Sequence, residues 1–289
     1  MADTKTELKQ TERYSIDHAS DGTITIKFVI PAADVEKARE KIVDELVKNV
    51  EIQGFRKGGA PRNLAEQKLN QQTVREEVLK KVLSEEYVAA VKSLNINPII
   101  NPRIHVGEFA EGTNLEFTAE TCETPAVELK NYKDEVRKIK PTPKIIVPGK
   151  QEQKEEKPKL DEILNAVLSV VEITIPKILI EQETDRLLSQ LLDELKRLGV
   201  SLDQYLSSRG KTGEQLRAEY SERAEKDLKL EFVLRKIADE EKITVEQKDI
   251  EVALGAIKDE KEKAQVSQNP YLVAAIIRQQ KTLDYLTKI

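Results

Sequence analysis

The chain has 289 residues, of which 39% are hydrophobic, 34% charged and 4% aromatic, and its formal net charge is −5. This length allows two domains or one elongated domain, and the low hydrophobic share predicts helices with much solvated surface rather than one large core. The negative charge excludes general affinity for nucleic acid such as DNA, so any contact with RNA must come from a local basic patch.

The first 50 residues predict a β-hairpin followed by a helix. Apolar and polar residues alternate over residues 22–30, as in a half-buried strand. Asp21-Gly22 is a hairpin signal that pairs this strand with residues 14–16. Asp34 is the expected cap of the following helix, in which apolar residues recur at helical spacing up to Val50.

A loop rich in glycine follows this helix, and its composition does not suggest a packing role. Its residues are Gly54, Phe55, Arg56, Lys57, Gly58, Gly59, Ala60 and Pro61. Arg56 and Lys57 can meet phosphates or carboxylates, and Phe55 can enter an apolar cleft or anchor the base of the loop. Pro61 suits the first position of the next helix. Local features alone fit a binding loop and an ordinary connector equally well.

The next elements complete a first domain, residues 1–140. A capping-box pattern at Thr73 begins a long helix whose apolar face runs to Leu94. Two strands follow, over residues 103–109 and 114–122. Together these elements predict a small α+β domain in which helices cover one face of an antiparallel sheet.

The remaining chain changes character twice. Residues 141–158 contain four prolines and a charged run without an apolar anchor, which predicts an extended linker. From residue 159 to residue 289 helical periodicity dominates, with short turns between long helices. We therefore expect a second domain that is all-α and elongated.

The loop and its surroundings resemble the ribosome-binding domain of trigger factor, a family of bacterial chaperones. The family motif reads Gly-Phe-Arg-x-Gly-Lys-x-Pro. The residues that match it are Gly54, Phe55, Arg56, Gly58 and Pro61. Gly59 stands where the family usually has lysine, so this chain lacks one cation of the motif. The likeness runs from about residue 14 to residue 140, and a weaker one covers the C-terminal half.

The resemblance implies an ATP-independent, ribosome-associated holdase that binds nascent or unfolded polypeptides. It implies docking near the polypeptide exit tunnel, on a ribosomal protein and on rRNA, through Gly54, Phe55, Arg56, Lys57, Gly58 and Pro61. Clients are expected on shallow apolar surface of the helical half, at Leu187, Leu191, Leu195, Leu254, Ile257 and Ile276.

The sequence shows no pattern that indicates catalysis. His18 and His105 are the only histidines, and neither has a partner at metal-ligand spacing, so no metal is expected. Gly210-Lys211-Thr212 lacks the earlier glycine of a phosphate-binding loop and is interpreted as a turn between helices. The single cysteine, Cys122, is interpreted as a small core or edge residue. We expect no catalytic residue and no cofactor.

The cell compartment is also predicted from the sequence. A lone cysteine is typical of a reducing compartment. The first 13 residues are polar, unlike a secretory signal, and no apolar run approaches the roughly 20 residues of a membrane span. We therefore expect a cytoplasmic protein without a membrane partner.

Two other functions stay open. Full-length trigger factors carry a peptidyl-prolyl isomerase domain where this chain has only residues 141–158, and domains begin at about 50 residues. Isomerase activity is therefore not expected, although it is the family's known chemistry. The other alternative is a helical scaffold for one dedicated partner, which would be recognised by a single stoichiometric partner in place of many nascent chains.

Overall fold

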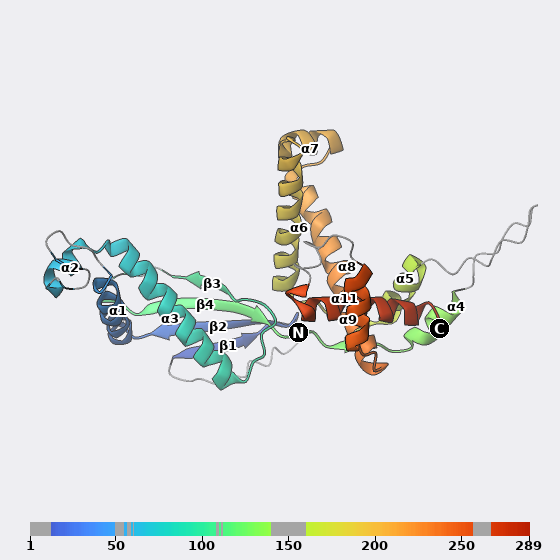
Figure 1. The fold of residues 1–289 in the computed structure, drawn as a ribbon, viewed down its shortest axis with the longest axis horizontal. Helices are drawn as coiled ribbons and strands as arrows, with labels where there is room; N and C mark the ends of the chain where they lie inside the picture. The colour runs from blue at the N-terminus through green and yellow to red at the C-terminus, as the bar shows by residue number, and fades with distance from the viewer. Residues whose placement is uncertain are drawn as a thin grey trace, which may run out of the picture. The chain divides into compact units, whose positions relative to one another are not determined.

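The structure is a computed structural model, and it describes two compact units of the chain (Figure 1). The described residues are 13–49, 55, 56, 59, 61–107, 110, 112–139, 160–256 and 267–289. The first unit contains the described residues up to Thr124 and Pro176–Leu179, and the second contains those of Pro125–Ile175 and Ile180–Ile289.

A four-stranded antiparallel sheet organises the first unit. Its strands are β1 (Tyr14–His18), β2 (Thr23–Ile30), β3 (Arg103–Val106) and β4 (Leu115–Cys122), in the spatial order β1-β2-β4-β3. The central pair is in register at Phe28 and Phe117, whose rings stack with centroids 4.3 Å apart. Gly22 closes the β1–β2 turn with φ +90°, a conformation that favours glycine. The predicted hairpin at Asp21-Gly22 is thereby confirmed.

Three helices accompany the sheet, namely α1 (Ala32–Val47), α2 (Arg62–Lys68) and α3 (Gln71–Leu94). Buried residues of α1 and α3 form one core with the apolar face of the sheet, and Figure 1 shows α3 lying across the strands. The predicted α+β arrangement is therefore confirmed. The capping box at Thr73 was wrong, because Asn70 caps α3 and its side chain accepts a hydrogen bond from the Gln72 N–H at 2.9 Å.

Helices dominate the second unit, as predicted. Its elements are β5 (Val127–Glu128), α4 (Tyr132–Lys138), α5 (Leu160–Val170), β6 (Glu172–Ile173), α6 (Lys177–Arg197), α7 (Leu202–Arg209), α8 (Gly213–Glu240), α9 (Gln247–Ala256) and α11 (Pro270–Leu286). Figure 1 shows α6 and α8 side by side, and α7 packs against both through an apolar cluster that includes Leu191 and Leu216. Gly210 ends α7 with φ +61° and Thr212 caps α8, so Gly210-Lys211-Thr212 is a turn between helices.

The segment before residue 140 packs in the second unit, although the sequence-based division placed it in the first. Leu129, Tyr132 and Val136 are buried with residues of α5, α8 and α11. β5 also pairs antiparallel with β6. Apolar partners that lie far along the chain thus determine where this segment packs.

Across the described residues, none of the helices has the length and apolar character needed to span a bilayer.

Candidate functional site

The loop between α1 and α2 presents an aromatic ring and a cation to solvent. Phe55 is 46% exposed although it is a large apolar residue. Arg56 is also exposed, and its guanidinium has no ion-pair partner within the described part of the chain. The predicted loop residues Gly54, Lys57 and Gly58 lie outside the described residues.

A backbone hydrogen bond joins two described residues of the loop. The Gly59 N–H donates to the Arg56 carbonyl at 2.7 Å, and a Cβ at Gly59 would lie 3.1 Å from the same oxygen. Pro61 is the N-cap of α2, with ψ 136°, and its carbonyl accepts from the N–H groups of Leu64 and Ala65. The helix therefore begins at Arg62 and not, as expected, at Pro61, because the backbone at Pro61 is still extended.

One ion pair links the start of α2 to α1, at the C-terminal end of the loop. Arg62 pairs with Glu66 at 2.7 Å and with Asp44 of α1 at 3.1 Å. The hydrogen bond to Glu66 and the charge of Asp44 raise the pKa of Arg62 above its usual value. Ala65 is 1% exposed on the inner side of α2. A loop presented in this way can offer an apolar ring and a positive charge to the same partner.

The leucines of α6 that the sequence suggested for client binding lie in the core. Leu187, Leu191 and Leu195 are 7%, 9% and 6% exposed. Leu191 and Leu195 pack with Leu216 of α8, so their helical spacing reflects the α6–α8 contact. We therefore correct the prediction, because these three side chains are not accessible to a client in this structure.

Accessible apolar residues lie on α9 and α11 and also at Leu192 and Leu198, which are 47% and 74% exposed. Of the predicted set, Ile276 is 58% exposed, Leu254 is half-buried and Ile257 lies outside the described residues. Three further residues that the sequence did not indicate as client-binding, Val252, Tyr271 and Leu272, are 75%, 88% and 57% exposed. We call Val252, Tyr271, Leu272 and Ile276 the α9/α11 apolar group. The sequence indicates this group only weakly, because Leu272 and Ile276 lie in the same apolar stripe as the buried Leu286.

A polar network anchors the C-terminal half of α11 to the end of α8. Glu241 accepts hydrogen bonds from the Tyr285 hydroxyl at 2.7 Å and the Tyr132 hydroxyl at 3.0 Å, and pairs with Lys133 at 2.7 Å. The hydrogen bonds from Lys133 and Tyr285 lower the pKa of Glu241, whereas burial and the bond to Glu241 raise the pKa of Tyr132. Arg278 also pairs with Asp239 at 2.6 Å.

The described part of the chain contains no cluster of side chains that could bind a metal ion. Groups of three or more His, Cys, Asp or Glu side chains positioned for a metal ion are absent from it. Cys122 is fully buried, and this burial raises the pKa of its thiol to about 11, so the thiol is protonated at neutral pH. His105 is exposed, with its Nε2 4.0 Å from Glu120.

Two family models match the chain and together span nearly all of it. The model described as "Bacterial trigger factor protein (TF)" matches residues 13–157, and the model described as "Bacterial trigger factor protein (TF) C-terminus" matches residues 146–288. The two matches overlap, and neither represents an isomerase domain.

Individual relatives are also trigger factors, and they match a shorter stretch of this chain than the family models do. The trigger factor of Macrococcus caseolyticus is 33% identical over 121 residues, which are 42% of this chain and 28% of that protein. The trigger factor of Alkaliphilus metalliredigens is 37% identical over 113 residues, or 39% of this chain and 26% of that protein. The matched stretch thus spans little more than a quarter of these relatives' length.

One solved structure matches over nearly the whole chain. It is titled "Promiscuous Substrate Recognition in Folding and Assembly Activities of the Trigger Factor Chaperone", and the match covers 94% of this chain and 99% of that one. The TM-score is 0.61 at 16% sequence identity, which indicates a shared fold.

Proposed function

Because the chain belongs to the bacterial trigger factor family, whose models match residues 13–157 and 146–288, we propose that it is an ATP-independent holdase that associates with ribosomes. In this proposal it binds nascent or unfolded polypeptides in the cytoplasm. The observation that carries the proposal is the exposed pair Phe55 and Arg56 in a loop that matches the family motif.

Docking uses two kinds of contact. Arg56 and Lys57 form charge-assisted hydrogen bonds with carboxylates of a ribosomal protein or with rRNA phosphates near the exit tunnel. Phe55 enters an apolar cleft, which contributes binding that salt does not weaken. The ion pair of Arg62 with Asp44 supports this role, because it holds the C-terminal end of the loop against α1.

Client binding uses shallow apolar surface rather than a fitted pocket. The α9/α11 apolar group supplies such surface, and binding to it withdraws apolar client segments from aggregation. Weak and reversible contacts suit this task, because clients must be released to fold.

The test of docking is co-sedimentation with ribosomes. A triple variant, Phe55→Ala with Arg56→Ala and Lys57→Ala, is expected to lose most binding. The matched control is Lys80→Ala with Val88→Ala and Lys92→Ala on α3, because it removes two exposed cations and one apolar residue that is also 46% exposed. The control is expected to bind as wild type. Undiminished pelleting of the loop variant would contradict the proposal.

We further infer that the chain does not catalyse prolyl isomerisation, because no isomerase-domain model matches it. Twisting an X–Pro bond faces a barrier of about 18–20 kcal/mol, and lowering it needs an enclosed apolar pocket. The test is proline-limited refolding at catalytic doses beside aggregation of a model client at stoichiometric doses. Faster refolding would favour the isomerase, whereas unchanged aggregation would favour the dedicated scaffold.

A further inference from the structure

The helix α9 has no fully buried residue among its described side chains. Residues 247–255, whose exposure the structure describes, are all exposed or half-buried. The neighbouring helix α11, by contrast, buries Val273, Thr282 and Leu286. Most helices in proteins are stabilised chiefly by the packing of an apolar face. Polar contacts therefore contribute a larger share of what holds α9 in place.

Arg278 of α11 contacts the turn between α8 and α9. Its guanidinium donates to the Ile243 carbonyl at 2.8 Å and to the carboxylate of Asp239, near the end of α8, at 2.6 Å. Between these two partners, Lys242 has φ +52°, which is unfavourable for a residue with a Cβ. Such a conformation persists where the surrounding structure fixes it. The contacts of Arg278 thus help to fix the path of the chain into α9.

Lys281, three residues further along α11, contacts the start of α9. Its ammonium group donates to the Thr244 carbonyl at 3.2 Å and to Oδ2 of Asp249 at 2.5 Å. The same carboxylate oxygen accepts the Glu246 N–H at 2.8 Å. Only 20% of the Asp249 side chain is exposed, so solvent screens this ion pair less than it screens a fully exposed one. Lys281 therefore connects the first turn of α9 directly to α11.

The placement of α9 beside α11 matters because the exposed apolar side chains come from both helices. Val252, which is 75% exposed, lies on α9, whereas the other members of the α9/α11 apolar group lie on α11. A client segment that covers both helices binds more tightly when the helices are already fixed, because less conformational entropy is lost on binding. Contacts that fix α9 to α11 can therefore control client affinity.

We propose that Arg278 and Lys281 are positioning residues for client binding, because they hold α9 beside α11 and so keep Val252 on the client-binding surface. The inference rests on the proposed holdase function and on the α9/α11 apolar group as its client surface. Neither cation contacts the client itself. Their loss frees the first turn of α9 and the turn before it, and Val252 then no longer forms one surface with α11.

The first test measures the placement of α9 without a client. The variant is Arg278→Gln with Lys281→Gln, in the full chain. Amide hydrogen exchange at residues 247–255 should be about fivefold faster than in wild type, because two ion pairs are lost and α9 opens more often. The single variant Lys281→Gln should show a smaller increase and serves if the double variant does not fold. Wild-type exchange rates in α9 of both variants would overturn the proposal.

A matched control separates the loss of these contacts from the loss of charge. Lys229→Gln with Lys236→Gln removes two cations from ion pairs that lie within α8, and α9 should then exchange as in wild type. Unchanged methyl signals of Val167 and Val233, which are fully buried, would establish that the core of the second unit is intact in each variant. Equal acceleration of α9 in the control would refute a specific role of the two α11 cations.

The second test measures the consequence for clients. The dose for half-maximal protection of a model client from aggregation should rise about twofold in Arg278→Gln with Lys281→Gln. Val252→Ser alone should raise this dose by a similar factor. Combined with the double variant, Val252→Ser should have no further effect, because Val252 has already left the surface. Independent effects that multiply would show that the cations do not act through Val252 and would overturn the proposal.

The two measurements distinguish this inference from the proposed function. A wild-type chain that fails to protect clients would contradict the holdase function, whereas faster exchange of α9 in the variant would still establish that Arg278 and Lys281 hold this helix. Equal protection by wild type and variant would leave the holdase function supported and refute the positioning role.

Discussion

Gly59 lies between α1 and α2 at a position where any side chain would come close to the Arg56 carbonyl. A Cβ there would lie 3.1 Å from the Arg56 carbonyl oxygen, which already accepts the Gly59 N–H at 2.7 Å. Many trigger factors nevertheless carry lysine at this position of the motif. A small shift of the Arg56 carbonyl, by a few tenths of an ångström, would accommodate the added atom.

We predict that Gly59→Lys strengthens ribosome co-sedimentation at low salt, because it adds a third cation beside Arg56 and Lys57. If the new contact is to an rRNA phosphate, the logarithm of the binding constant should fall more steeply with the logarithm of the salt concentration. The slope should steepen by about one. Gly59→Gln adds the same Cβ without charge and is the control, which should not strengthen binding. Equal gains from both substitutions would show that charge is not the cause.

Glu241 makes the second unit sensitive to acid. Hydrogen bonds from Lys133 and Tyr285 lower its pKa in the folded protein, and its unfolded value is about 4.3. A carboxyl group with a lowered folded pKa contributes stability at pH values above its unfolded pKa. That contribution disappears as the pH falls through the folded pKa.

We predict that Glu241→Gln lowers the free energy of unfolding by about 1–3 kcal/mol at pH 7, since hydrogen bonds to a charged group are lost. The difference from wild type should shrink as the pH falls below about 4. Urea unfolding across this pH range measures both effects. The control is Glu240→Gln, whose exposed pair with Lys236 spans 3.5 Å, and it should change stability by less than about 1 kcal/mol. Identical behaviour of the two variants would refute the role of Glu241.

At the scale of elements, α11 is divided along its length. Its C-terminal half is held by Arg278 and Tyr285 and buries Leu286, which is 1% exposed. Its N-terminal half buries Val273, which is 6% exposed, but also carries Tyr271 and Ile276, which are 88% and 58% exposed. One helix can therefore be anchored at one end and offer apolar surface at the other.

We predict that Tyr271→Ser with Leu272→Ser and Ile276→Ser weakens the suppression of aggregation, because client segments lose apolar surface to cover. The dose for half-maximal protection of a model client should rise by about threefold or more. Stability should change little, because exposed side chains contribute little to folding. Leu64→Ser with Val88→Ser, residues that are 45% and 46% exposed in the first unit, is the control. Full protection by the α11 variant would exclude this surface as the client site.

For the whole molecule, the packing of residues 125–139 has a measurable consequence. Leu129, Tyr132 and Val136 lie in the same core as Val167, Val233 and Leu286. Residues 125–139 and 160–289 therefore contribute to one hydrophobic core, although they lie on opposite sides of the Pro-rich and charged stretch 141–158.

We predict that limited proteolysis cuts first within residues 141–158 and that the two fragments stay together in native buffer. Size-exclusion chromatography followed by a denaturing gel checks this, and about 6 M urea should separate the fragments. Leu129→Ser with Val136→Ser removes apolar contacts between them, so the nicked variant should dissociate. Dissociation of the nicked wild-type chain would show that residues 125–139 are not required by the second unit.

The sequence alone predicted most of the local structure. The strand over residues 22–30, the turn at Asp21-Gly22 and the helical character of the C-terminal half follow from periodicity and turn chemistry, which are properties of neighbouring residues. The loop over residues 54–61 was selected through its resemblance to the family motif, because its local features fit a binding loop and an ordinary connector equally well. None of these inferences requires knowledge of a distant partner.

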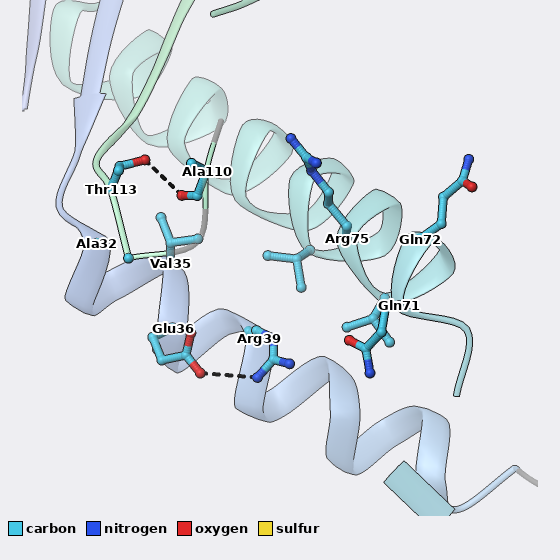
Figure 2. Close-up of a pocket in the computed structure, with 12 residues that line it drawn as sticks. Ala32, Val35, Glu36, Arg39, Gln71, Gln72, Arg75, Ala110 and Thr113 are labelled. Atoms are coloured by element: carbon cyan, nitrogen blue, oxygen red, sulfur yellow. Dashed lines mark hydrogen bonds and ion pairs between the residues drawn. The ribbon is translucent and has the colours of Figure 1, made fainter. Parts of the chain in front are cut away.

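Burial was decided only by the tertiary structure. The stripe of Leu187, Leu191 and Leu195 has the spacing of a core face and of a client-binding face alike, and its contact with α8 buries it. Leu272 and Leu286 belong to one stripe of α11, yet only Leu286 meets the core. A cavity of about 450 Å³ likewise exists only because α1, α3 and the turn before β4 meet in space (Figure 2). Periodicity identifies an apolar face, but partners that are distant in the sequence determine whether that face is covered.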